Sequence, residues 1–433
     1  MAYTTAFLIL CPFVRDCPSA LSLRRISPHA LSTGPVKSDE RQSSLYEAPA
    51  TILARLVGNS SAAGSPSMAW GAASISEQLF LSKAFADALQ PLHTRPYFHR
   101  ATHAPARNDI TLATLVTPDR YAILARLAER YKGPLSVAVH ITHPAPLDSH
   151  PTAEEQISAL QDLIKSSKAL RERADIHLLV SPFPRALNAW RNAARLFARS
   201  ELVLLLDADF VPPPSFPAAA LLSALSPALA RRVIEGTAAL VLPAFEYTVQ
   251  ADGADASKFP KTKAELMKEV KKGKIGMFHK AWAPGHNCTD YDRYGKTRSG
   301  EVYEVETYTS AYEPYVVVAR DAGGWCDERF TGYGGNKAAC LYELHLSGTA
   351  FFVLADQFVI HQSHAYEEKA RKSERKYNRK IYADFREEAC LRHIRSLGAE
   401  GALGSPRAQN AMRECAKLRG VRALLTQLEA AYT

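Results

Sequence analysis

The hydrophobic positions in the middle of the chain alternate between short β-rich runs and longer segments with helical spacing. Apolar runs cover Ile110 to Thr117, Leu135 to Pro144 and Ile176 to Pro182, and a fourth run begins at Leu202. Segments whose apolar residues recur every three or four positions separate these runs. Strands that alternate with helices predict an α/β fold with a central, mostly parallel sheet flanked by helices. Because the strand runs are continuously apolar, we expect both faces of the sheet to be covered.

The two flanks of this region have different patterns. Residues 1–90 are rich in Ser, Pro, Ala and Gly, and they predict a disordered, low-complexity linker with one short helix at Ser74 to Leu89. The apolar run Ala6 to Val14 is interrupted by a cysteine and a proline and lacks a basic leader, so we expect neither a clear membrane anchor nor a signal peptide there. One large domain is predicted over 91–395 and a helical extension over 396–433.

The composition and the net charge indicate which class of partners the protein favours. The hydrophobic fraction of 47% and the charged fraction of 22% are typical of globular proteins, and the net charge of +9 favours anionic partners such as phosphates, nucleotides or nucleic acid. Basic residues are concentrated in Lys258 to Lys280 and Lys369 to Lys380, although each run also fits a solvated helix face. The sequence has no helix-turn-helix, zinc-finger or RNA-recognition pattern, so nucleic-acid binding is the weakest interpretation. Seven cysteines without a CxxC pair argue against a structural zinc site.

The most informative polar residues lie in the segment ELVLLLDADFVPPP, residues 201–214. Asp207 and Asp209 follow an apolar strand at its carboxyl end, where α/β sheets bind their ligands. Alternate strand residues point the same way, so the two carboxylates are expected to project together. Two carboxylates about 6 Å apart repel by roughly 3 kcal/mol at an effective dielectric of about 20, and a divalent cation removes that repulsion. The alternative is that one aspartate caps the next turn and the other is solvated.

Several segments in series resemble glycosyltransferase family 49. They are NAWRNAARLFARSELVLLLDADFVPP, LVLPAFE, EPYVVVARD, DERFTGYGGNKAACLYEL and FFVLADQFVIHQSHA, and the similarity covers residues 105–390 in the same order. The resemblance implies a GT-A fold, the Rossmann-like fold of nucleotide-diphospho-sugar transferases, with residues 91–395 as the catalytic domain. It also implies metal-dependent, inverting transfer from a UDP-sugar to a glycan or glycoprotein in the Golgi or secretory lumen. The sugar implied is glucuronate, with xylose, glucose and N-acetylglucosamine left open.

Carried onto this chain, the resemblance makes Asp207 and Asp209 ligands of Mn²⁺ or Mg²⁺. A histidine is expected as a further ligand, with His361 as the first choice and His364 as the second. Neutral imidazole suits Mn²⁺ and similar ions. The alternative for each histidine is a hydrogen-bonded core residue or a surface group.

A helix that precedes the acid pair is expected to offer polar side chains to the sugar or the diphosphate. Arg191 suits bidentate recognition of oxygen atoms, and Asn188 and Asn192 lie one helical turn apart beside it. Packing or capping is the alternative for all three. By analogy with the fold, the uridine is expected against the end of the first strand, at Leu115, Val116 and Thr117.

An inverting transfer also needs a carboxylate that takes the proton of the acceptor hydroxyl. Asp327 is the first candidate, and Glu246 and Glu343 are the alternatives, although Glu343 also fits a packed helix position. Aromatic faces for sugar stacking are expected in the segment FHKAWAPGHNCTDYDRY, at Trp282, His286 and Tyr294. A catalytically silent member of the same fold that binds a glycan or a nucleotide is the alternative function.

Overall fold

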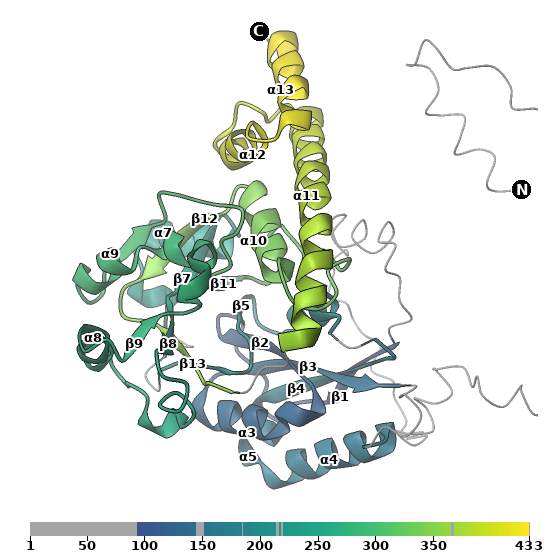
Figure 1. Ribbon diagram of the computed structural model, residues 1–433, viewed down its shortest axis with the longest axis vertical. Coiled ribbons are helices and arrows are strands. Elements are labelled where there is room, and N and C mark those ends of the chain that lie inside the picture. The colour runs from purple at the N-terminus through teal and green to yellow at the C-terminus, as the bar shows by residue number, and fades with distance from the viewer. Residues whose placement is uncertain are drawn as a thin grey trace, which may run out of the picture. The chain divides into compact units, whose positions relative to one another are not determined.

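A nine-stranded mixed sheet is the centre of the fold (Figure 1). The computed structural model describes residues 93–143, 151–183, 185–213, 216–217, 220–364 and 368–432. The linker and the short helix expected within 1–90 lie outside these residues. Across the nine-stranded sheet the strand order is β1-β4-β3-β2-β5-β11-β7-β12-β10.

The expected alternation of strands and helices is confirmed in the first half of this sheet. Parallel neighbours form the order β4-β3-β2-β5. These strands are β2 (Ile110–Val116), β3 (Leu135–Thr142), β4 (Ala174–Ser181) and β5 (Leu202–Leu205). The helices between them are α3 (Tyr121–Arg130), α4 (Ala153–Ser166), α5 (Lys168–Arg173) and α6 (Leu187–Leu196). Nearly every residue of the four strands is buried, as their continuous apolar runs require.

The second half of the sheet contains strands of both directions. β7 (Ala238–Leu242) and β12 (Ala350–Leu354) run in the same direction as β2 to β5, so most strands share one direction, as expected. Three strands run the other way, namely β1 (His93–His99), β10 (Val302–Glu304) and β11 (Tyr315–Ala319). The sheet is mixed because β11 inserts antiparallel between β5 and β7.

A second sheet receives the chain directly after β5. Its order is β6-β13-β8-β9, and its strands are β6 (Phe210–Val211), β8 (Ala244–Tyr247), β9 (Ile275–Met277) and β13 (Val359–His361). β5 ends at Leu205 and β6 begins at Phe210. Residues 206–209, which include both aspartates, therefore form the crossing from one sheet to the other.

Helices cover the sheets and continue to the end of the described chain. In Figure 1, α3, α4 and α5 lie on one side of β2 to β4, and α10 and α11 lie on the other. The remaining helices are α7 (Pro227–Ile234), α8 (Lys263–Lys271), α9 (Tyr291–Lys296), α10 (Asn336–Leu346), α11 (Glu368–Ala399), α12 (Gln409–Cys415) and α13 (Arg419–Tyr432). Helix α11 crosses residue 395, so the boundary between a catalytic domain and a helical extension stays a prediction. Among the described helices none is long and apolar enough to span a membrane.

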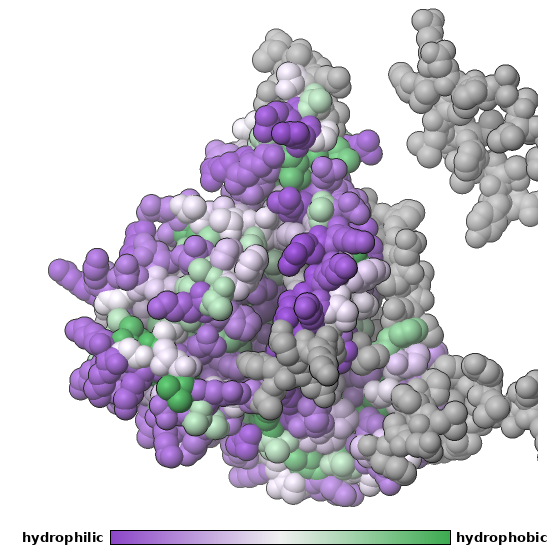
Figure 2. All heavy atoms as spheres, viewed as in Figure 1, coloured by the Kyte–Doolittle hydropathy of each residue, from purple (hydrophilic) through white to green (hydrophobic). Residues whose placement is uncertain are grey.

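Two disulfides tie the later helices to their surroundings. Cys326–Cys340 joins the segment after β11 to α10, and Cys390–Cys415 joins α11 to α12. Of the cysteines in the described ranges, Cys288 is the free one. Figure 2 shows that hydrophilic side chains dominate the visible face and follow the length of α11, which carries the whole of the second basic run.

Candidate functional site

Asp209, His361 and His364 bring three possible metal ligands together. β6 pairs with β13 in a register that sets Phe210 opposite His361, so Asp209 is carried to the end of β13. The carboxylate of Asp209 lies 3.1 Å from Nε2 of His364 and 3.7 Å from Nε2 of His361. One ligand atom from each of the three residues lies within 4.8 Å of the other two. One oxygen and two imidazole nitrogens fit Mn²⁺ or a similar divalent cation.

Asp207 has a different set of partners. Its carboxylate accepts hydrogen bonds from the hydroxyl of Tyr315 at 2.9 Å, from Nζ of Lys337 at 3.1 Å and from Arg191 at 3.3 Å. The two aspartates do not behave as alternate residues of one strand, because β5 ends at Leu205 and both lie beyond it. Within the described residues the ligand cluster contains Asp209 and not Asp207. A role for Asp207 as a metal ligand therefore stays a prediction.

Both aspartates are ionised at neutral pH. Burial alone would raise the pKa of Asp207, but the charges of Lys337 and Arg191 lower it to about 2. Burial acts in the same way on Asp209, and hydrogen bonds from His361 and His364 hold its pKa far below the ordinary value. The site thus combines two carboxylates with cationic side chains. Such a set can hold a metal cation and anionic phosphate groups side by side.

The end of β2 lies beside Asp207 and Asp209. Leu115 lines a small cavity of about 20 Å³ together with Arg191 and Asp207. Thr117 precedes a turn of 3₁₀ helix, η2 (Pro118–Arg120), and Arg120 lies 3.7 Å from the carboxylate of Asp209. Val116 is buried in the core at 1% exposure and does not line the cavity. Contact with a uridine is untested for all three residues of the strand end.

Helix α6 presents a polar stripe to the segment between β11 and α10. The amide of Asn188 donates to the carbonyls of Asp327 at 2.8 Å and Asn336 at 3.0 Å. Asn192 donates to the carbonyl of Cys326 at 2.8 Å and accepts from its N–H at 3.0 Å. Both asparagine side chains are buried and satisfied inside the protein, so the structure indicates that they position this segment rather than contact a donor.

Arg191 is the member of the stripe that reaches the acid pair. It bridges the side chains of Asn336, at 2.6 Å, and Asp207, at 3.3 Å. The next element after α6 is β5, which ends just before the two aspartates. This position agrees with the expectation that Arg191 lies at the site. Contact between Arg191 and a phosphate group stays a prediction.

The three candidate bases occupy different surroundings. Asp327 is held by the guanidinium of Arg329, with Nε at 3.0 Å from both carboxylate oxygens. Glu343 is buried in an ion pair with Arg392 and His393, on the side of α10 that faces α11. Glu246 accepts a hydrogen bond from the N–H of His279 at 2.9 Å, and burial raises its pKa. These contacts indicate structural roles for Asp327 and Glu343, and the charge of His361 acts on Glu246.

The aromatic residues expected to stack on a sugar also separate into two groups. Tyr294 is fully buried and packs against Phe245, and His286 is buried at 1% exposure. Neither can offer a face to a ligand in this structure. Trp282 lies in η5 (Lys280–Gly285) and is 60% exposed, so its ring is available.

Sequence reasoning missed several residues at the site. Lys337 stands in the GYGGNK segment, but helical spacing alone does not show that its amine turns toward Asp207. Tyr315 and Glu313 belong to the segment EPYVVVARD, and no local pattern reveals that β11 runs beside β5. Arg120 carries no sequence signal. Tyr315 and Glu313 reach the site through the strand order, and Lys337 reaches it through the packing of α10. Local periodicity reports neither.

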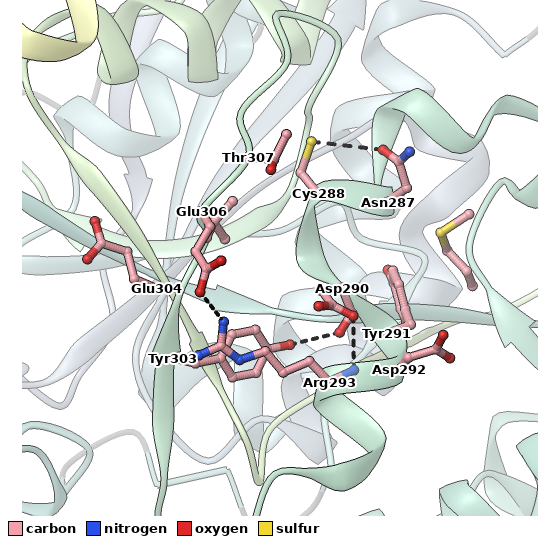
Figure 3. A pocket seen from close by; sticks show the side chains of 12 residues that line it. Asn287, Cys288, Asp290, Tyr291, Asp292, Arg293, Tyr303, Glu304, Glu306 and Thr307 are labelled. Atoms are coloured by element: carbon pink, nitrogen blue, oxygen red, sulfur yellow. Dashed lines mark hydrogen bonds and ion pairs between the residues drawn. The ribbon is translucent and has the colours of Figure 1, made fainter.

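A larger cavity, of about 440 Å³, is lined by none of the residues Asp209, His361 and His364. Figure 3 shows acidic side chains around it, including Asp290, Asp292 and Glu304, with Arg293 directed at Glu306. The free thiol of Cys288 also lines it. Carboxylates outnumber cations here, so a nucleoside diphosphate would be repelled. The lining of this cavity therefore does not favour a nucleotide, whereas the smaller cavity beside Asp207 is also lined by Arg191 and Lys337.

Comparison with known proteins shows the family to which the chain belongs. The family model described as "Glycosyl-transferase for dystroglycan" matches residues 109–187 and 181–394. The chain is 33% identical to rat xylosyl- and glucuronyltransferase LARGE2 over 60% of this chain and 35% of the relative. It is 31% identical to glycosyltransferase-like protein gnt14 of Dictyostelium discoideum over 59% of this chain and 37% of the relative. The match thus spans about a third of the length of these curated relatives.

Among solved structures, GalNAc-T7 with UDP, GalNAc and Mn²⁺ superposes with a TM-score of 0.36 and 13% identity, covering 60% of this chain and 45% of that chain. A likeness at this level carries no argument about function.

Proposed function

Since the chain belongs to the family of glycosyltransferases for dystroglycan, in which a GT-A fold is expected, we propose that it is a metal-dependent, inverting glycosyltransferase that uses a UDP-sugar. The observation that carries the proposal is the meeting of Asp209, His361 and His364 at the crossing between the two sheets. A silent member of the family would have no need for ionised ligands and cations arranged in this way. Binding of nucleic acid is supported only by net charge.

Each side chain of the site has a place in this proposal. Asp209, His361 and His364 would hold Mn²⁺ or Mg²⁺, which supplies a Lewis acid that neutralises charge on the departing UDP. Asp207 fixes Lys337 and Arg191 in place, and their remaining N–H groups would bind the diphosphate. Arg120, at the end of β2, adds a further cation beside Asp209. The end of β2 forms the wall for the uridine.

The proposed donor sugar is glucuronate. The names of the relatives include xylosyl- and glucuronyltransferases, and an anionic sugar suits a site with several cationic side chains. UDP-xylose is the second donor to test, and a glycan or glycoprotein is the proposed acceptor. Two disulfides are typical of oxidising compartments, which agrees with a place in the Golgi or secretory lumen.

A thermal-shift screen tests the donor. The full chain is heated with Mn²⁺ and UDP-glucuronate, UDP-xylose, UDP-glucose or UDP-N-acetylglucosamine, each with and without EDTA. A ligand at about 100 times its Kd stabilises the folded state by about 2.7 kcal/mol, so we expect a rise in Tm of several degrees with UDP-glucuronate that EDTA removes.

The outcomes of the screen are distinct. Stabilisation by a UDP-sugar, with no UDP released in a parallel turnover assay, would favour the silent nucleotide-binding alternative. A Tm that no UDP-sugar changes in the presence of Mn²⁺ would refute the proposal. A gel shift with bulk RNA that UDP does not compete would revive nucleic-acid binding.

A further inference from the structure

Glu313 is a carboxylate at the site without a partner of its own. It lies two residues before β11, next to Pro314. Among the residues that the structure describes, its carboxylate makes no hydrogen bond and no ion pair, unlike Asp327 and Glu246. The charges of Lys337 and Asp207 act on it, so it lies within electrostatic reach of the acid pair. A side chain in this position is free to accept a hydrogen bond from a ligand.

Glu313 and Trp282 meet at Gly285. The N–H of Glu313 donates to the carbonyl of Gly285 at 2.9 Å. A Cβ atom placed on Gly285 would lie 3.3 Å from Oε1 of Glu313 and 3.4 Å from Cδ1 of Trp282. The glycine therefore lets a carboxylate and an indole ring lie side by side. Trp282 is 60% exposed, although an aromatic ring of this size is usually largely buried.

This combination suits a saccharide. An exposed indole offers an apolar face on which a sugar ring can stack. A carboxylate beside it accepts hydrogen bonds from sugar hydroxyls, which are donors as well as acceptors. The pair also lies near the proposed donor site, because Glu313 precedes Tyr315 by two residues and the hydroxyl of Tyr315 donates to Asp207 at 2.9 Å.

We propose that Trp282, Gly285 and Glu313 form the subsite for the acceptor sugar and that Glu313 is the general base of the transfer. The inference rests on the proposed function. The oxygen of the acceptor hydroxyl forms a bond to the anomeric carbon, and the bond from that carbon to the diphosphate oxygen breaks. The electron pair of the broken bond leaves with UDP, and the hydroxyl proton passes to the carboxylate of Glu313. The configuration at the anomeric carbon is inverted.

The surroundings of Glu313 suit this task better than those of the other carboxylates. Burial raises the pKa of the Glu313 carboxyl above its ordinary value; the charge of Lys337 opposes that rise and the charge of Asp207 adds to it. A base is most effective when its pKa is raised toward the working pH. Glu246 also has a raised pKa, but its carboxylate is used to hold the backbone at His279.

Two variants of the full chain test the inference. UDP release is measured with UDP-glucuronate or UDP-xylose and Mn²⁺, with water alone as acceptor and then with added methyl β-xyloside or methyl β-glucuronide. Glu313→Gln is expected to slow UDP release at least ~100-fold with every acceptor, while the Tm rise caused by UDP and Mn²⁺ stays unchanged. Trp282→Ala is expected to raise the KM for the glycoside about tenfold, with release to water unaltered.

Matched controls are the exposed residues Glu304 and Tyr377. Glu304→Gln and Tyr377→Ala are expected to behave like the wild-type protein. If Glu313→Gln keeps more than a tenth of the wild-type rate, or if Glu246→Gln alone shows the large loss, Glu313 is not the base. If the KM for the glycoside is the same in Trp282→Ala, the subsite is refuted. A wild-type protein whose Tm does not respond to UDP and Mn²⁺ would instead show that the proposed function itself is wrong.

Discussion

Asp209→Asn is expected to lower the rate of sugar transfer at least ~1,000-fold. The substitution keeps the size of the side chain but removes the anionic ligand that lies between His361 and His364. A bound cation contributes several kcal/mol to stabilisation of the transition state, and each 1.36 kcal/mol is a factor of ten in rate. UDP release from UDP-glucuronate with Mn²⁺ measures the loss.

The fold should tolerate this change. Asp209 lies in a turn between two sheets, and the amide oxygen of an asparagine can still accept a hydrogen bond from His364. Loss of the charge pairing with Arg120 and the histidines is offset by relief of the repulsion from Asp207. We expect the Tm of Asp209→Asn without ligand to stay within ~2 °C of the wild type, which is less than about 1 kcal/mol for a domain of this size. Asp292→Asn, at an exposed carboxylate of the separate cavity, is the control. Full activity of Asp209→Asn would contradict the assigned ligand.

Glu343→Gln is expected to have the opposite profile, with a large loss of stability. Glu343 is 4% exposed and pairs with Arg392 and with His393, whose Nε2 lies 2.8 Å away. Removal of one member of a buried ion pair typically costs about 3 to 5 kcal/mol because the remaining charge is left without its partner. Chemical denaturation should show a fall of about 3 kcal/mol in the free energy of unfolding.

The pH dependence of the same pair has a definite sign. Burial alone would raise the pKa of Glu343, but Arg392 and His393 lower it from 4.5 to about 2. A carboxyl whose pKa is depressed by folding stabilises the protein above its unfolded pKa and loses that contribution as the pH falls. The stability difference between wild type and Glu343→Gln should therefore be full above pH 4.5 and shrink toward pH 2.

The exposed Glu387→Gln on α11 is the control for both measurements and should match the wild type. If Glu343→Gln keeps its stability and loses only transfer activity, Glu343 acts in catalysis, and its structural role is wrong.

Local periodicity predicted the parts of the fold that depend on neighbours in the sequence. The first four βαβ strands and their helices follow from alternating apolar patterns, and β2 and β3 begin at the expected residues. The same patterns could not show that β11 inserts antiparallel between β5 and β7. That insertion is a long-range pairing, and it is what brings Tyr315 beside Asp207.

The sequence likewise indicated only some residues of the candidate site. The acid pair is proposed from a local motif and the two histidines from the family resemblance, and the structure brings Asp209 to the histidines. The idea that both aspartates project alike assumed a strand through residue 209, whereas the chain leaves the sheet after Leu205. Glu313 was overlooked because nothing in its own segment shows that Gly285 and Trp282 lie beside it.

The most direct test of the central claim is a crystal structure of the protein with UDP and Mn²⁺, with anomalous scattering recorded at the manganese edge. The account predicts an anomalous peak bound by Asp209, His361 and His364 at the crossing between the two sheets. A peak elsewhere, for example among the carboxylates of the separate cavity at Asp290 and Asp292, would contradict it.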